Sequence, residues 1–392
     1  MKEIKCDVLV VGAGPAGSSA AWSSAKENLN TIIIDKKSVP GKDACAETLS
    51  KAFLGYLPFK IPNRFLKWQL KGLEFYYKDF HISRDEGIWW KSYPLNRKEF
   101  DPYLLDVAIR QGAQYRPRTK FISLKHDRNF KVNEVVVKDF DSNRKITIKP
   151  RVVIAADGVQ SNVLKAIGKT TPQKTAIGYI KSYEYQNLKL ENAHCGHIYF
   201  GAFADGAYAY IFPKSETTAN IGIATLSPYH LESKFNNFLK IISKQLQGSK
   251  KAVDRSGKAP IKNPSKKVVY GNIIFTGDSA NQNLKPFVEG IQPGIICGAF
   301  AGNAAAEYLR TNKKLDATYT RLINEKIGKL FSESDVIGLE LVSSFEQKNK
   351  LRFLQEIAMF SYTLNDDDMR KIKKLDEHQA QLFLEEKLRS KI

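Results

Sequence analysis

The chain has 392 residues, 43% of them hydrophobic, so it can bury a large core and is long enough for two closely joined domains. Its 61 Lys and Arg against 41 Asp and Glu give a net charge of +20, which favours an anionic partner or a well-solvated surface. These basic residues are scattered and form no tail, which argues against a nucleic-acid-binding arm. Four widely spaced cysteines show no metal-ligand spacing, so no metal is expected.

A glycine-rich turn after the first predicted strand is the most specific motif. Residues 8–11 are an apolar run typical of a strand buried in a parallel sheet. Gly12-Ala13-Gly14-Pro15-Ala16-Gly17 then leads into a predicted helix over 18–26, whose free N–H groups favour a phosphate. Asp35 ends the next apolar run, about twenty residues on, where a carboxylate can accept from a ribose hydroxyl. This order of elements predicts a dinucleotide site.

The following segments predict one sheet close to the dinucleotide site and a second sheet beyond it. Residues 73–82 are expected to form one strand with a turn near 83–87, and 100–111 to form a helix. The segments expected to build a small antiparallel sheet are 121–124, 134–140 and 145–148. Residues 175–265 are rich in strands and aromatic residues, which indicates the second sheet.

Two more buried strands end in an acid beside a glycine. One covers 152–156 and ends in Asp157-Gly158, and the other covers 268–276 and ends in Gly277-Asp278. Residues 290–306 carry no charge but are rich in Gly and Ala, so they predict a helix packed under a cofactor and not a membrane span. The first strand begins almost at once, so we expect no signal peptide and a cytoplasmic location, which the cysteine usage also favours.

Three acidic strand ends suit an extended FAD, held at its adenosine, pyrophosphate and ribityl chain. At these motifs the chain resembles the geranylgeranyl reductase family, within the flavoprotein superfamily that includes p-hydroxybenzoate hydroxylase. The resemblance covers nearly the whole chain and includes a characteristic arginine segment, with Arg97 and Asp101. It implies that FAD contacts a set of residues from all three motifs and the loops beside them: Gly12, Ala13, Gly14, Ala16, Gly17, Asp35, Lys36, Cys45, Ala46, Arg97, Phe121, Asp157, Gly158, Gly277, Asp278, Val288, Gly290 and Ile291.

Two segments resemble the reductases more than the hydroxylases of that superfamily. Cys45 stands where the family has a cysteine that faces the flavin. Residues 208–213 and 222–224 resemble the family's aromatic signature for isoprenoid chains, and stacked rings suit a long apolar cavity. The implied substrate-binding residues are Tyr208, Tyr210, Phe212, Pro213 and Gly222. Ala224 and Val288 depart from the pattern, because the family has glycine at both positions, and a valine strains any position with positive φ.

The resemblance implies an α/β fold, in which a Rossmann-like FAD-binding domain alternates with an antiparallel-sheet substrate domain and precedes a helical C-terminal region. We expect residues 1–55, 95–170 and 266–312 in the first domain, 56–94 and 171–265 in the second, and 313–392 in the helical region. The implied activity is reduction of carbon–carbon double bonds in geranylgeranyl chains of archaeal-type lipid precursors.

Three residues are candidates for catalysis: Cys45, Tyr210 and Glu289. Each also has a plain structural interpretation, as a buried thiol, a core ring and a loop acid. The proton donor stays open between bound water, Tyr210 and Cys45. The electron donor is equally open between ferredoxin and NAD(P)H. The positive charge suits anionic lipid headgroups, and the Trp89-Trp90 pair before Lys91 suits a membrane surface, so peripheral membrane association is an expectation.

Two other functions fit some of these features. A flavin-dependent monooxygenase or halogenase on the same fold would use NAD(P)H and O₂, although the Trp-x-Trp-x-Ile-Pro motif of halogenases is absent. A flavin-dependent nucleic-acid-modifying protein would need a contiguous basic face and binding that weakens steeply with salt. The scattered charges disfavour this second alternative.

Overall fold

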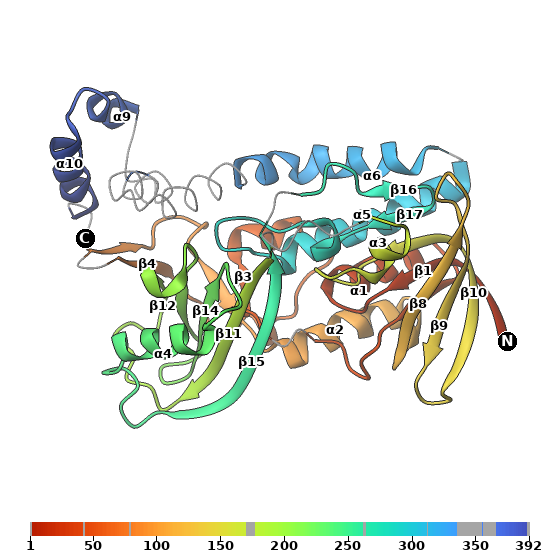
Figure 1. Ribbon diagram of the computed structural model, residues 1–392, viewed down its shortest axis with the longest axis horizontal. Coiled ribbons are helices and arrows are strands. Elements are labelled where there is room, and N and C mark those ends of the chain that lie inside the picture. Colours follow the sequence, from red (N-terminus) through yellow and green to blue (C-terminus); the bar gives the residue numbers. More distant parts are fainter. Residues whose placement is uncertain are drawn as a thin grey trace.

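The computed structural model describes residues 2–41, 44–77, 80–169, 177–261, 264–311, 313–334, 355 and 366–389. Two large sheets dominate these ranges, and helices cover them (Figure 1). The first sheet is mostly parallel and the second mostly antiparallel, which confirms the predicted α/β fold class. Within the described ranges, no helix combines the length and the apolar character needed to cross a membrane.

The first sheet is built around β1 and β10, which pair in parallel over nearly their whole length. Its apolar strands have no solvent-facing side, so Val8, Ile33 and Ile154 are fully buried. The order is β16 (Val269–Tyr270), β17 (Ile273–Phe275), β10 (Arg144–Ala155), β1 (Lys2–Val11), β2 (Thr31–Ile34) and β7 (Gln114–Arg116), and the ribbon of β8 (Thr119–His126) and β9 (Val132–Asp139) pairs antiparallel with β10.

Small residues bring two helices close together beside this sheet. Helices α1 (Pro15–Lys26) and α5 (Ile291–Thr311) pack along each other, and glycine and alanine on both let their backbones approach closely. Helix α2 (Arg97–Arg110) packs on α1, and the short α3 (Asn162–Ala166) follows β10. The chain continues through α6 (Leu315–Ile323) and the π-helical turn η6 (Asn324–Gly328).

The second sheet presents one face to helix α4 (Leu231–Ile241), which buries Phe235 and Phe238 against it. Alternation along the strands sends the opposite set of side chains, including Tyr210, to the other face. The order is β15 (Lys250–Pro260), β11 (Ile177–Gln186), β14 (Ala219–Thr225), β13 (Ala209–Pro213), β12 (Cys195–Phe200), β4 (Gly72–Tyr77) and β5 (Phe80–Arg84), and only β12 and β4 pair in parallel.

The C-terminal helices α9 (Asp366–Ile372) and α10 (Glu377–Arg389) pack against the second sheet. Ile372 and Leu384 join Phe75 and Ile82 in one buried apolar cluster. These helices agree with the predicted helical C-terminus. The rest of that prediction, over 335–354 and 356–365, lies outside the described residues.

Four element predictions were wrong. The strand expected over 268–276 is two short antiparallel strands, β16 and β17, because the chain turns back at Gly271, which has φ of +57°. The single strand expected over 73–82 is two antiparallel strands, β4 and β5, and in the sequence the polar pair at 78–79 separates their aromatic residues. The strands expected at 145–148 and 152–156 are one strand, β10. On one side it pairs in parallel with β1 over nearly its whole length, and on the other its first half pairs antiparallel with β9 and its end in parallel with β17. Residues 36–50, expected to be irregular, end in β3 (Thr48–Ser50), which pairs with β6 (Ser92–Pro94).

Candidate active site

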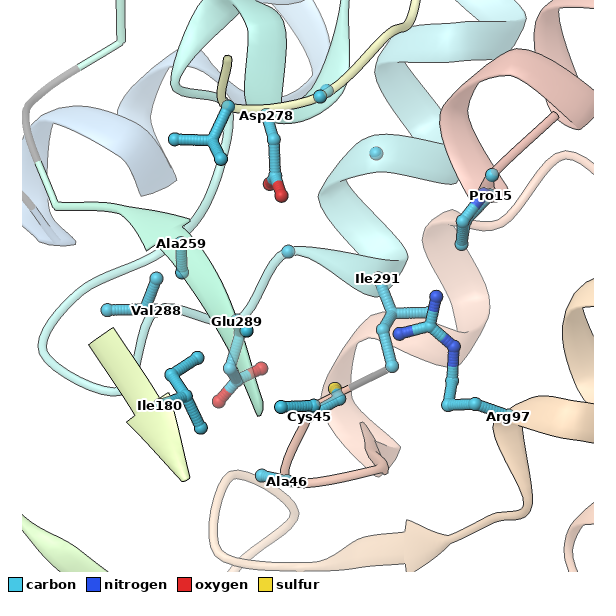
Figure 2. Close-up of a pocket in the computed structure, with 18 of the residues that line it drawn as sticks. Pro15, Cys45, Ala46, Arg97, Ile180, Ala259, Asp278, Val288, Glu289 and Ile291 are labelled. Atoms are coloured by element: carbon cyan, nitrogen blue, oxygen red, sulfur yellow. The ribbon is translucent and has the colours of Figure 1, made fainter. Parts of the chain in front are cut away.

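A cavity of about 650 Å³ runs from the glycine-rich turn to the aromatic face of the second sheet. Its walls come from both sheets and from the loop that carries Cys45 (Figure 2). A cavity of this size can bury most of a cofactor, and its mixture of apolar walls with a few polar groups is typical of ligand sites. The sequence predictions converge here, because most of the proposed cofactor residues line this cavity.

The glycine-rich turn has the conformation that a phosphate site requires. Gly12 has φ of +101°, and a Cβ there would lie 2.4 Å from the Ala156 carbonyl oxygen. A Cβ on Gly17 would lie 1.8 Å from the Gly12 carbonyl oxygen, so Gly17 permits the helix to pack on the strand. A Cβ on Gly14, by contrast, would meet no atom within 4 Å. The open space at Gly14, at the N-terminus of α1, can accept a pyrophosphate.

Asp35 lines the cavity next to the glycine-rich turn, and two backbone N–H groups hold its carboxylate in place. One carboxylate oxygen accepts from the Ala13 N–H at 2.8 Å and the other from the Lys37 N–H at 2.8 Å. Lys36 and Phe121 line the same part of the cavity. Each carboxylate oxygen keeps a further lone pair, so Asp35 can also accept from a ribose hydroxyl.

Asp157 has one oxygen that lacks a partner. Its Oδ2 accepts from the N–H groups of Asn162 and Val163, at 2.7 and 3.1 Å, and so caps α3. Its Oδ1 is buried at the cavity without a hydrogen bond from any described residue. Burial raises the pKa of Asp157. An unsatisfied buried oxygen is costly, and a ligand hydroxyl would relieve it.

The third motif, Gly277-Asp278, follows β17 and lies beside the residues that lead into α5. The Asp278 carboxylate lies near Gly290, since a Cβ added to Gly290 would lie 3.2 Å from Asp278 Oδ1. Gly277, Asp278, Gly290 and Ile291 all line the cavity. Together with the open space at Gly14 and the unpaired Asp157 oxygen, these residues fit an extended FAD, which they would hold.

Arg97 lines the cavity as half of a buried ion pair. Its guanidinium donates to both carboxylate oxygens of Asp101, at 2.5 and 2.6 Å. Burial disfavours the charged form, but the Asp101 carboxylate outweighs it and holds the pKa of Arg97 above its usual value. The bidentate contact therefore holds the Arg97 guanidinium in a fixed position in the cavity wall, at the first turn of α2.

Cys45 lies in the loop between β2 and β3, half-buried, and lines the cavity (Figure 2). Its sulfur accepts from the Glu47 N–H at 3.3 Å, and its carbonyl oxygen accepts from Asn220 Nδ2 at 2.6 Å. Ala46, which follows it, also lines the cavity. The loop that carries the thiol is thereby attached to strand β14 of the second sheet.

Val288 and Glu289 occupy the loop before α5. Val288 has φ of +56°, a conformation that costs most for a β-branched residue, so its departure from glycine carries backbone strain. The Glu289 carboxylate receives no hydrogen bond from any described residue, and burial raises its pKa to about 7. Glu289 thus holds or releases a proton near neutral pH inside the cavity.

The aromatic wall is formed by Tyr208, directly before β13, and by Tyr210 and Phe212 within it. Tyr208, Tyr210 and Phe212 all line the cavity, with neighbouring ring centres 6.3 and 5.3 Å apart. The Tyr208 hydroxyl donates to the Phe287 carbonyl oxygen at 2.8 Å. Burial raises the pKa of Tyr208, and the nearby Glu289 and Cys45 raise it further. The wall is therefore apolar, and its phenols stay protonated.

Two predicted substrate residues, Gly222 and Pro213, lie next to the aromatic wall but outside the cavity lining. Gly222 pairs with Tyr210 across the strands, and a Cβ there would lie 2.3 Å from the Tyr210 hydroxyl oxygen. Pro213 ends β13 and pairs with Ala219. Neither residue is among those that line the cavity, whereas Ala224 is. The Tyr210 hydroxyl lies over Gly222, buried and without a partner among the described residues.

A buried ion network beside Cys45 was not anticipated from the sequence. The Glu47 carboxylate is 2% exposed and accepts from Lys214 Nζ at 2.5 Å and from Arg255 at 2.7 Å. Glu184 accepts from the same Lys214 at 2.9 Å. The only local signal was an acid two residues after the candidate cysteine. The partners of Glu47, Lys214 and Arg255, lie 167 and 208 residues further along the chain.

Comparison with protein families matches residues 5–220 to the FAD binding domain. The chain is 31% identical to the digeranylgeranylglycerophospholipid reductase of Methanocaldococcus jannaschii over 334 residues, which cover 82% of each protein. It is 29% identical to digeranylgeranylglycerophospholipid reductase 2 of Methanosphaera stadtmanae over 377 residues, 91% of this chain and 92% of the relative. These matches extend over both sheets.

Solved structures agree in fold. The crystal structure of a geranylgeranyl bacteriochlorophyll reductase-like protein from Thermoplasma acidophilum has a TM-score of 0.80 at 23% identity, with 91% of this chain and 96% of that chain covered. A probable FAD-dependent monooxygenase from Pseudomonas aeruginosa has a TM-score of 0.66 at 14% identity, over 90% and 99%. The fold is thus shared with other flavoproteins. The sequence matches decide the family: this chain is an FAD-binding protein that belongs to the digeranylgeranylglycerophospholipid reductase family.

Proposed function

We propose that the chain is an FAD-dependent reductase that saturates carbon–carbon double bonds of geranylgeranyl chains in archaeal-type membrane lipid precursors. The observation that carries this proposal is one continuous cavity, with an FAD site at one end and the ring faces of β13 at the other. The names of the relatives support the same substrate class. The aromatic wall gives a flexible apolar chain a large contact area at little entropic cost.

Reduced FAD, when bound, supplies a hydride to one carbon of the double bond. The chain's own residues then have to place the alkene, stabilise positive charge on it and deliver a proton to the other carbon. Tyr208 and Tyr210 line the cavity, and a cation over an aromatic ring gains about 0.5–2 kcal/mol. The two hydrogens and two electrons balance the reduction of one double bond.

Glu289 is the proton donor that the geometry favours. Its carboxyl faces the cavity, lacks a hydrogen-bond partner among the described residues and is protonated over much of the range below pH 7, because burial raises its pKa to about 7. The Tyr210 phenol is the alternative donor, but its pKa lies well above the ordinary value for a tyrosine. Cys45 is proposed to orient the alkene between Glu289 and the FAD site.

The test is an anaerobic incubation of FAD-loaded protein with dithionite and a geranylgeranyl glycerophospholipid, followed by mass spectrometry of the lipid. Stepwise gains of two hydrogens are expected. Tyr210→Phe retains the ring and should retain most activity, whereas Tyr210→Leu should lose it. A yellow protein that leaves the lipid unchanged but consumes NADPH and O₂ with an aromatic compound would overturn the proposal.

A further inference from the structure

Large apolar side chains are exposed at one end of the cavity. Trp89 is 53% exposed, and Tyr56 and Ile88 are each 46% exposed. They are not scattered, because the ring of buried Phe53 lies 5.7 Å from Trp89 and 6.1 Å from Tyr56. We call Tyr56, Ile88 and Trp89, with Phe53 beneath them, the docking patch. Grouped exposed aromatics of this kind mark interaction sites.

The docking patch is continuous with the proposed substrate cavity. Trp89 and its neighbours Trp90 and Lys91 line that cavity. The 3₁₀ helix η1 (Lys51–Tyr56) is joined to the same turn by a hydrogen bond from the Lys51 N–H to the Lys91 carbonyl oxygen, at 2.8 Å. A ligand that touched the patch would therefore reach the apolar interior without crossing water.

The chain segment that carries Phe53 and Tyr56 is strongly positive. Residues 48–73 contain no acidic residue but five basic ones, Lys51, Lys60, Arg64, Lys67 and Lys71. None of these five forms an ion pair with an acidic residue in the described ranges, and all but Lys51 are exposed. Asp85 and Glu86, on the turn before Ile88, are acidic residues close in sequence to the patch. Indoles and phenols flanked by unpaired basic residues match the boundary of an anionic bilayer.

We propose that the docking patch binds an anionic lipid bilayer and takes the geranylgeranyl chain directly from it into the cavity. This inference rests on the proposed function for its substrate. Moving an isoprenoid chain through water costs about 0.8 kcal/mol for each exposed CH₂ group, so direct transfer removes a large barrier. The basic segment draws the protein to the anionic surface, and the rings insert at the headgroup level.

The test is co-sedimentation of the full FAD-loaded chain with vesicles of phosphatidylglycerol and phosphatidylcholine. Tyr56→Ser/Ile88→Ser removes two patch residues that do not line the cavity. This variant should lose about tenfold in vesicle partitioning. Tyr229→Ser, at an isolated residue that is 73% exposed before α4, should bind as the unmodified protein does. Lys51→Glu should weaken binding to anionic vesicles, and Glu86→Gln should strengthen it.

Activity on two forms of the lipid separates this inference from the proposed function. The Tyr56→Ser/Ile88→Ser variant should reduce detergent-dispersed lipid at the normal rate but lose activity on the same lipid in vesicles. Equal activity on both forms, or no vesicle binding by the unmodified chain, would overturn the docking proposal and leave the reductase proposal intact. Vesicle binding without lipid reduction in either form would instead refute the reductase proposal.

Discussion

The Glu47 carboxylate accepts a hydrogen bond from Lys214 Nζ at 2.5 Å, which ties the Cys45 loop to the end of strand β13. Glu47 also accepts from the Arg97 N–H at 3.3 Å, at the start of α2. The residue that places its N–H on the Cys45 sulfur therefore connects the FAD side of the cavity to the aromatic wall. Burial makes these contacts stronger and their loss more costly.

Replacing Glu47 by Gln should destabilise the fold by about 3–5 kcal/mol, because it leaves Lys214 and Arg255 with one carboxylate instead of two. Glu184→Gln is the matched control. It removes the other acid of the network, but Glu184 is 21% exposed and lies 3.7 Å from Arg255. Its cost should be about 1 kcal/mol. Unfolding in denaturant measures the free energy of unfolding of both variants. Equal losses for Glu47→Gln and Glu184→Gln would contradict a special role for Glu47.

Gly222→Ala should displace the Tyr210 ring, because the new Cβ would lie 2.3 Å from its hydroxyl oxygen. Overpacking of this kind costs about 1–3 kcal/mol, and lipid reduction should fall with it. Gly55→Ala, where a Cβ meets no atom within 4 Å, is the control and should behave as the unmodified chain. Normal turnover by Gly222→Ala would show that the position of this ring is unimportant.

The partly buried Glu289 makes activity and stability depend on pH. Its pKa of about 7 lies above the ordinary value of 4.5, so between these values the folded state holds a proton that the unfolded state has lost. Stability from this group is complete below about pH 4.5 and falls as the pH rises to about 7. Glu289→Gln should therefore gain stability over the unmodified chain as the pH is raised through this window.

The rate of lipid reduction should depend on the protonation of the Glu289 carboxyl, because only the protonated carboxyl can donate a proton. Turnover of the unmodified chain should decline above about pH 7, and Glu289→Gln should lose both most of its rate and this decline. A Glu289→Gln variant with an unchanged rate and pH profile would remove Glu289 from the mechanism and leave Tyr210 as the candidate.

Val288→Gly should stabilise the chain by about 1 kcal/mol, because the strain at φ of +56° exceeds the extra entropy of an unfolded glycine. Val288→Ala retains a Cβ and therefore the strain, so it should not be more stable. The two variants are compared by unfolding in denaturant. An unstabilised Val288→Gly would mean that the valine side chain compensates through its packing.

The cofactor end of the site was predictable, whereas its connection to the second sheet was not. Gly12, Gly14 and Asp35 are close in sequence, and their spacing encodes the local geometry. Glu47 meets Lys214 and Arg255 only after the second sheet has formed, so no local pattern reveals the network. Similarly, Gly222 resembled a substrate contact in the motif. Only the strand register places it behind Tyr210.

The most direct test of the central claim is lipid reduction in heavy water. FAD-loaded protein, dithionite and a geranylgeranyl glycerophospholipid are incubated anaerobically in ordinary water and in heavy water, and the lipid is analysed by mass spectrometry. The account predicts that each reduced double bond gains two hydrogen atoms in ordinary water and two deuterium atoms in heavy water. A lipid of unchanged mass in both solvents, or one that has gained oxygen when air is admitted, would contradict it.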